Sequence, residues 1–109
     1  MPGSYELKHS DSKFMWHLRA VNGETILTSV RYESKEAARN GIESCRVSAI
    51  LDFCYERGTS SAGQPYFVVR GSNRELIGTS KMYSSNAARE RGIDICKANG
   101  PTASVVDAT

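Results

Sequence analysis

The sequence has no long hydrophobic run and little excess charge, and each absence excludes a class of protein. No apolar stretch in the 109 residues approaches the roughly 20 that a transmembrane helix needs. Residues 1–13 are polar, so we expect no secretory signal. The 14 basic and 12 acidic residues leave a net charge of +2, too small to indicate a polyanionic partner. We therefore expect one small cytoplasmic domain, residues 1–109, without membrane association.

Cysteine is also scarce, and its three positions argue against metal or redox chemistry. Cys45, Cys54 and Cys96 form an odd number, which together with the polar N-terminus indicates reduced thiols. No two cysteines are spaced as a CxxC pair, and neither His9 nor His17 stands at ligand spacing from a cysteine. We expect no metal and no cofactor, and we expect Cys45 and Cys96 to be small apolar core residues.

Motifs that carry catalysis are absent as well. The chain has no GxSxG, HExxH or glycine-rich phosphate loop, and its two histidines have no counterparts in the second half of the sequence. General acid–base work needs titratable groups that converge in a pocket, and no such group of residues is visible. We therefore predict that the protein is not an enzyme and assign no catalytic residue.

What the sequence does contain is an internal repeat with an offset of 51 positions. Residues 14–49 align with residues 65–100 without a gap, and 12 of the 36 positions are identical. One-third identity over such a window is far above chance, so the chain consists of two copies of one unit. The identical pairs are Arg19/Arg70, Asn22/Asn73, Glu24/Glu75, Ile26/Ile77, Thr28/Thr79, Ser29/Ser80, Tyr32/Tyr83, Ser34/Ser85, Ala37/Ala88, Gly41/Gly92, Ile42/Ile93 and Cys45/Cys96.

Each copy contains a predicted β-hairpin. Apolar and polar residues alternate over residues 14–21, as in a strand with one buried face. Asn22 and Gly23 follow and favour a hairpin turn, because both tolerate positive φ. Residues 25–30 supply the returning strand. The second copy has Arg74 in place of Gly23, so we expect its turn to be less regular.

The register of this hairpin depends on the length of its loop. A two-residue loop would place Leu27 beside Leu18, whereas a three-residue loop with a glycine bulge would place Ile26 there. The second copy keeps Ile77 but has Gly78 where the first has Leu27. We therefore favour the bulged loop, with Ile26 opposite Leu18 and with Ile26 and Ile77 in the core.

An amphipathic helix follows each hairpin. Ser34 and Ser85 precede the helical patterns and are predicted N-caps. Gly41 and Gly92 lie in mid-helix, where glycine costs about 1 kcal/mol relative to alanine. Their presence in both copies predicts a close approach of helix to sheet. Short strands are predicted at residues 5–8, 53–56 and 104–107, which gives a unit of three strands, a helix and a strand.

These patterns together resemble the repeat of the YegP-like proteins, a family of small bacterial proteins. The resemblance covers both halves and departs at Gly71, Arg74 and Asn86 in the second copy. The residues that carry it are Trp16, Leu18, Ala20, Asn22, Gly23, Glu24, Ile26, Ser29, Tyr32, Ser34, Lys35, Asn40, Gly41, Ile42 and Ser44.

The resemblance implies an α+β fold but no reaction, ligand or partner. Two tandem βββαβ repeats, at about residues 5–56 and 57–107, would form one antiparallel sheet with two helices packed on it. Their C-terminal strands, near residues 53–56 and 104–107, would each pair with the opposite half. A unit of about 50 residues has a marginal core by itself, so sharing a sheet is a physical solution. We expect a monomer in which the repeats replace a dimer.

One face of the predicted sheet is a candidate binding surface. If both helices cover the same face, then His17, Arg19, Tyr66 and Arg70 lie on the open one. Aromatic and basic residues on a sheet are able to bind single-stranded nucleic acid by stacking and phosphate contact. The competing interpretation is a solvated or partly covered sheet face, which the nearly balanced charge favours.

Other repeated residues have structural interpretations. Trp16 is predicted to lie in the core, and Tyr32 and Tyr83 are predicted to pack at the helix starts. Asn22, Glu24, Asn73 and Glu75 lie at the two hairpin tips, and we interpret them as turn residues, with a binding site at the tips as the alternative.

The leading hypothesis is a small non-catalytic binding or interaction module whose partner, a macromolecule or another ligand, the sequence does not identify. Weak single-stranded nucleic-acid binding on the open face is the alternative.

Overall fold

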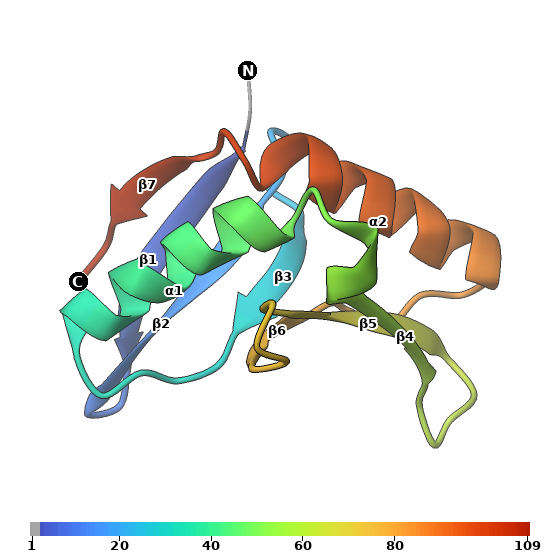
Figure 1. The fold of residues 1–109 in the computed structure, drawn as a ribbon, viewed down its shortest axis with the longest axis horizontal. Helices are drawn as coiled ribbons and strands as arrows, with labels where there is room; N and C mark the ends of the chain where they lie inside the picture. The colour runs from blue at the N-terminus through green and yellow to red at the C-terminus, as the bar shows by residue number, and fades with distance from the viewer. Residues whose placement is uncertain (1–2) are drawn as a thin grey trace.

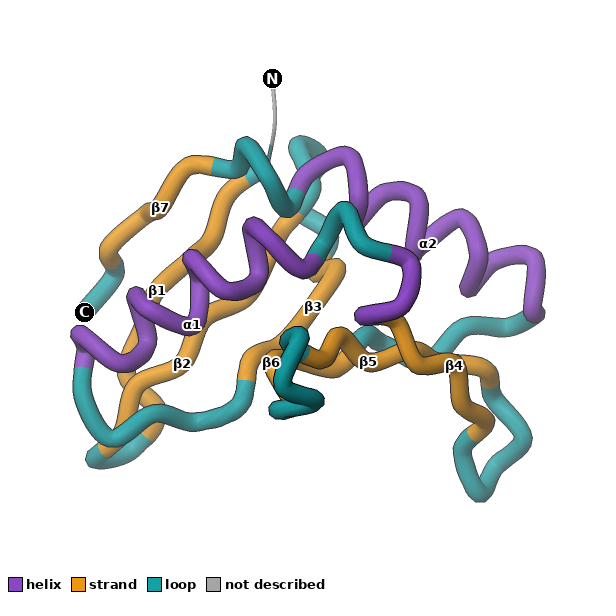
Figure 2. The backbone as a smooth tube through the Cα atoms, viewed as in Figure 1, coloured by secondary structure: helices purple, strands orange, loops and turns teal. Residues whose placement is uncertain are grey.

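The computed structural model describes residues 3–109. In this part of the chain seven strands form one sheet, and both α-helices cover the same face of it (Figures 1 and 2). The sheet order is β4-β5-β6-β3-β2-β1-β7. The elements are β1 (Ser4–Ser10), β2 (Lys13–Arg19), β3 (Thr25–Ser29), α1 (Lys35–Ser48), a 3₁₀ turn (Asp52–Cys54), β4 (Tyr55–Thr59), β5 (Pro65–Arg70), β6 (Leu76–Thr79), α2 (Asn86–Asn99) and β7 (Ser104–Asp107).

The two halves are related by an approximate twofold arrangement centred between β3 and β6. Thr28 pairs with Thr79, which stands 51 positions later, and β2 and β1 lie beyond β3 as β5 and β4 lie beyond β6. Ser34 and Ser85 cap the helices as predicted, since each hydroxyl accepts a backbone N–H of the first turn at 3.0 Å. Among residues 3–109, no helix is long and apolar enough to cross a membrane.

The strands that follow the helices pair with the opposite half, as predicted, but they are not equivalent to each other. β4 pairs antiparallel with β5 and takes the place that β1 has in the first half, because Tyr55 faces Val69 as Tyr5 faces Leu18. The repeating unit is therefore βββα, and β7 is an additional strand. β4 serves both as the last strand of the first predicted βββαβ unit and as the first strand of the second.

β7 runs parallel to β1, so the sheet is mixed rather than wholly antiparallel. The reason lies at the end of α2, which is held beside the beginning of β1. The backbone N–H of Gly3 donates to the Asn99 side chain at 2.8 Å, and that of Ser104 donates to the Gly3 carbonyl at 3.2 Å. The chain leaving α2 therefore meets β1 at its N-terminal end and continues in the same direction.

Both hairpins close with the same three-residue loop. The N–H of Gly23 donates to Ala20 at 2.9 Å, and the N–H of Arg74 donates to Gly71 at 2.8 Å. The two residues have positive φ values of 86° and 68°. The irregularity that we expected in the second turn is not found. Arg74 adopts the left-handed conformation, and its guanidinium donates to the Phe53 carbonyl at 3.1 Å.

The strand register differs from the prediction because each returning strand contains a second bulge. Ile26 is an extra residue between the Arg19–Thr25 and Leu18–Leu27 pairs, so Leu18 faces Leu27. The predicted pairing of Leu18 with Ile26 is wrong. The predicted burial is confirmed, since Ile26 and its counterpart in the second copy are both core residues.

The thiols lie in the core beside two buried tyrosines. Cys45 and Cys96 are fully buried as predicted, and Cys54 is buried as well. Burial raises the pKa of Cys45 to about 12 and that of Cys96 to about 11. Burial also raises the pKa of Tyr5 and of Tyr55 far above the ordinary value.

The hydroxyls of these tyrosines join the halves at the ends of the helices. Tyr5 from β1 donates to the carbonyl of Gly100, which caps α2, at 2.6 Å. Tyr55 from β4 donates to the carbonyl of Ala49, which caps α1, at 2.7 Å. The two helix ends touch, because a Cβ added at Gly100 would lie 2.5 Å from the Ala49 Cβ.

The left-handed residue of the second hairpin gives a first prediction. We expect Arg74→Gly to have a free energy of unfolding about 1 kcal/mol higher than Arg74→Ala, because only glycine adopts positive φ without strain. Both variants lose the guanidinium contact, so urea unfolding of the pair isolates the backbone effect. Gly23→Ala is the matched control in the first hairpin and should lose a similar amount. Equal stability of the two Arg74 variants would contradict the assignment.

The buried thiols give a second prediction, on alkaline pH. Their folded pKa values of about 12 and 11 exceed the ordinary value of 9.0. The unfolded chain therefore loses protons first, and the contribution of these thiols is complete below pH 9 and is lost as the pH rises toward 11–12. We expect Cys45→Ala to flatten the fall in unfolding free energy between pH 9 and 11, measured by urea titration. A curve parallel to that of the unmodified protein would show that Cys45 does not contribute.

Candidate ligand-binding grooves

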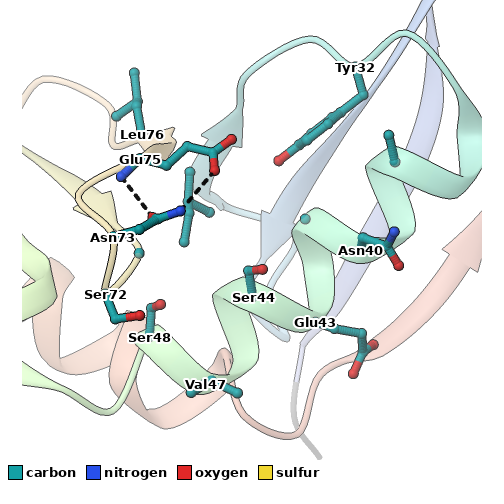
Figure 3. Close-up of a pocket in the computed structure, with 14 residues that line it drawn as sticks. Tyr32, Asn40, Glu43, Ser44, Val47, Ser48, Ser72, Asn73, Glu75 and Leu76 are labelled. Carbon is teal, nitrogen blue, oxygen red and sulfur yellow. Dashed lines mark hydrogen bonds between the residues drawn. The ribbon is translucent and has the colours of Figure 1, made fainter.

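A groove with a volume of 690 Å³ lies between α1 and the β5–β6 turn (Figure 3). We call it the α1 groove. One wall comes from the first half of the chain and the other from the hairpin tip of the second half. Its lining consists of Tyr32, Ala37, Asn40, Gly41, Glu43, Ser44, Val47, Ser48, Gly71, Ser72, Asn73, Glu75, Leu76 and Ile77.

The equivalent region between α2 and the β2–β3 turn, which we call the α2 groove, is divided. It consists of two adjoining hollows of 230 and 600 Å³. Ile95 lines both of them, and α1 has Ser44 at the equivalent position. Six of the repeated identities recur in the two grooves: Asn22/Asn73, Glu24/Glu75, Ile26/Ile77, Tyr32/Tyr83, Ala37/Ala88 and Gly41/Gly92.

The hairpin tips hold their glutamates in place through the preceding asparagines. The Asn73 side-chain oxygen accepts the N–H of Glu75 at 3.0 Å, and Asn22 does the same for Glu24. The Asn73 amide also contacts the Glu75 carboxylate at 3.4 Å. The asparagines are thus turn residues, as interpreted from the sequence, but the same turns project both glutamates into grooves.

The tyrosines at the helix starts pack against the mid-helix glycines. A Cβ at Gly41 would lie 2.1 Å from the Tyr32 hydroxyl, and Gly92 has the same relation to Tyr83. The close approach predicted from the two glycines is therefore made by a tyrosine ring of the connecting segment. Tyr32 is fixed by two backbone hydrogen bonds with Phe14, of 2.9 and 2.7 Å. Burial raises the pKa of both tyrosines.

The two grooves differ in charge. Lys81 and Arg91 line the α2 groove, where the first half has Val30 and Asn40. The α1 groove contains two carboxylates and, among the described residues, no lysine or arginine in its lining. Glu43 is paired with Arg46 of the same helix at 3.1 Å. In Figure 3 the side chain of Glu43 extends away from the hairpin tip, whereas Glu75 points toward the hydroxyl end of Tyr32.

The open sheet face carries the residues proposed from the sequence, but its arginines are paired with acids. Arg19 contacts Glu6 of β1 at 3.1 Å, and Arg70 contacts Glu56 of β4 at 3.4 Å. Charge therefore alternates across this face, and no positive stripe passes through the two arginines. Nucleic-acid binding there stays a prediction that the geometry does not favour.

The other two predicted residues also have local partners. The His17 Nδ1 atom lies 3.2 Å from the Thr28 hydroxyl. Burial lowers the pKa of His17, and the positive charges of Arg19 and Lys8 lower it further. Tyr66 covers Gly58 on the neighbouring strand, where an added Cβ would lie 2.7 Å from the ring.

The grooves were missed from the sequence because each is built from both halves. The sequence did contain one signal, the repetition of Asn-x-Glu at the two hairpin tips. The turn explains the repeated asparagine but does not require a glutamate. The two copies also differ at positions 30/81, 40/91 and 44/95. These differences could be interpreted only after the structure had shown the two related grooves.

Comparison with known proteins identifies the family. The family described as Domain of unknown function (DUF1508) matches the chain twice, over residues 9–52 and 60–107. The UPF0339 protein YegP of Escherichia coli K12 is 46% identical over the full length of both chains, and a UPF0339 protein of Shewanella oneidensis is 44% identical over the full length of both.

The chain belongs to the YegP-like, UPF0339 family. The solution NMR structure of yegP from Escherichia coli, titled a protein of unknown function, matches with a TM-score of 0.93 and 45% identity, and the match covers 100% of this chain and 95% of that one. The solution NMR structure of the Shewanella oneidensis UPF0339 protein matches with a TM-score of 0.92 and 42% identity, over 98% and 92% of the two chains. The double match also agrees with two copies of one unit in this YegP-like chain.

The packing of tyrosine on glycine gives a third prediction. We expect Gly41→Ala to destabilise the protein by about 1–3 kcal/mol, because the new methyl group overlaps the Tyr32 ring. In a Tyr32→Ala background the same change should instead stabilise by about 1 kcal/mol, the helix preference for alanine over glycine. Urea unfolding of the four proteins measures this coupling. Equal effects of Gly41→Ala in both backgrounds would contradict it.

Proposed function

We propose that this YegP-like protein is a non-catalytic binding module and that the α1 groove is its binding site. The observation that carries the proposal is the difference between two related grooves. Both are built from the same repeated residues, yet Lys81, Arg91 and Ile95 line the α2 groove. The equivalent residues of the first half are Val30, Asn40 and Ser44, and the last two line the α1 groove. The two basic residues and the isoleucine that line the α2 groove thus have no counterparts of the same kind in the first half.

The composition of the α1 groove supports binding rather than catalysis. Its polar lining is made of serine, asparagine and glutamate side chains and the Tyr32 hydroxyl. Among the described residues, no histidine or cysteine lines it, so a nucleophile paired with a base is missing there. Val47, Leu76 and Ile77 add apolar surface, and a mixture of apolar walls and a few polar groups is typical of small-ligand sites. The buried reduced thiols support a cytoplasmic location.

A groove-filling variant tests the proposal. We expect small amines, alcohols, carboxylates and amides, added at millimolar concentration to ¹⁵N-labelled protein, to shift amide signals of residues 40–48 and 71–77. Ser44→Ile copies the residue of the α2 groove and should weaken the shifts at least tenfold, because a branched side chain then divides the groove. Ser44 is exposed, so the fold should be retained.

The matched control is Glu36→Gln, on the same helix but outside the groove lining, which should leave the shifts unchanged. Shifts that map instead to His17, Arg19, Tyr66 and Arg70 would favour the open sheet face. Shifts that persist in Ser44→Ile would contradict binding in the α1 groove.

A further inference from the structure

The α2 groove contains a cation site that the chain fills with its own side chain. The Lys81 ammonium contacts the Glu24 carboxylate and lies 5.4 Å from the centroid of the Tyr83 ring. A carboxylate and an aromatic face together provide both the charge and the π surface that favour an ammonium group. Glu24 and Tyr83 are both positions that the repeat keeps identical.

The α1 groove has the same two groups without the lysine. Glu75 and Tyr32 are equivalent to Glu24 and Tyr83, whereas Val30 stands in place of Lys81. The backbones correspond at this point, because the Ser29 and Ser80 hydroxyls make the same hydrogen bonds with the following carbonyl, at 2.7 and 2.8 Å. Val30 therefore occupies the lysine's place on the chain but brings no charge.

Glu75 has no basic partner of its own. Among residues 3–109, no lysine, arginine or histidine nitrogen lies within 4.0 Å of its carboxylate, whose polar contact is the Asn73 amide at 3.4 Å. Figure 3 shows the Glu75 carboxylate and the hydroxyl end of the Tyr32 side chain pointing toward one another across the groove. Burial raises the pKa of Tyr32, and the negative charge of Glu75 acts in the same direction, which agrees with this placement.

We propose that the α1 groove binds a primary alkylammonium group, held between Glu75 and Tyr32 as Lys81 is held between Glu24 and Tyr83. This inference rests on the proposed function, because it assigns a ligand class to the same groove. The Lys81 stem has four carbons, so the ligand carries an unbranched chain of about that length. The hydroxyl groups of Ser44, Ser48 and Ser72 also line the groove. The ammonium is supplied either by a free diamine or by a lysine side chain of another protein.

Three probes of one length test the charge requirement: n-butylammonium, n-butanol and n-butyrate. In ¹H–¹⁵N spectra of the full chain, together with the Tyr32 ring signals, we expect saturable shifts with n-butylammonium and at least tenfold weaker binding of the other two. Glu75→Gln should weaken n-butylammonium binding at least tenfold. The matched control is Glu24→Gln, which makes the same change at the equivalent position of the α2 groove and should leave binding in the α1 groove unchanged.

Exchanging the residues between the grooves provides the converse test. Val30→Lys should place an ammonium beside Glu75 and abolish n-butylammonium binding. Lys81→Val should open the second site, so that n-butylammonium now also shifts the Tyr83 ring signals. Both substitutions copy the residue found in the other half of this chain, which favours retention of the fold.

The outcomes separate this inference from the proposed function. If n-butanol binds the α1 groove as tightly as n-butylammonium, or if Glu75→Gln binds unchanged, the cation site is wrong while the groove remains a binding site. If none of the probes shifts the groove, both are wrong. Where the cation site holds, 1,5-diaminopentane is compared with Nα-acetyl-lysine methylamide. Tighter binding of the diamine assigns a free amine, and tighter binding of the lysine derivative assigns a protein side chain.

Discussion

The contact between the C-terminal ends of α1 and α2 is the constraint on which the arrangement of the two halves depends. Gly100 has to be small because Ala49 lies against it, and Tyr5 and Tyr55 each donate a buried hydrogen bond to one of these helix ends. A buried hydroxyl that lost its acceptor would cost about 1–3 kcal/mol, so these bonds oppose any sliding of one half past the other. The same contact holds α1 beside the hairpin tip of the second half, and the α1 groove exists only because of that placement.

Much of the fold could be predicted from the sequence because it is encoded locally and twice. Strand alternation, serine caps and the three-residue loop depend on neighbouring residues, and each was found where the pattern indicated. The predicted register was wrong because Ile26 and Leu27 are both apolar. The sequence therefore does not distinguish a strand that pairs Ile26 with Leu18 from a strand with a bulge at Ile26, in which both residues are buried. The parallel direction of β7 depends on where α2 ends in space relative to Gly3, which no local pattern records.

The candidate site was less predictable than the fold because its walls are far apart in the sequence. Glu75 and Tyr32 come from different halves, and their meeting follows from the twofold arrangement rather than from spacing. The residues selected from the sequence, His17, Arg19, Tyr66 and Arg70, were found instead from the alternation of side chains along each strand. Their charges are compensated within the sheet, where Arg19 and Arg70 each have an acidic neighbour on the adjacent strand. A basic residue on a strand is therefore poor support for a binding face until the opposite side chain is known.

Duplication within one chain permits what a symmetric dimer of identical units does not, namely a different residue at each of two equivalent positions. A dimer that acquired a lysine at the position of Val30 would place an ammonium group beside the glutamate of both grooves at once. In a tandem repeat, Lys81 forms an ion pair with Glu24 between the halves, while Val30 brings no positive charge to Glu75 of the other groove. The pair with Glu24 is surface-exposed, and such pairs contribute at most about 1 kcal/mol. Lys81 thus adds little stability, and the larger consequence of the difference at this position is that the two grooves are no longer equivalent in charge.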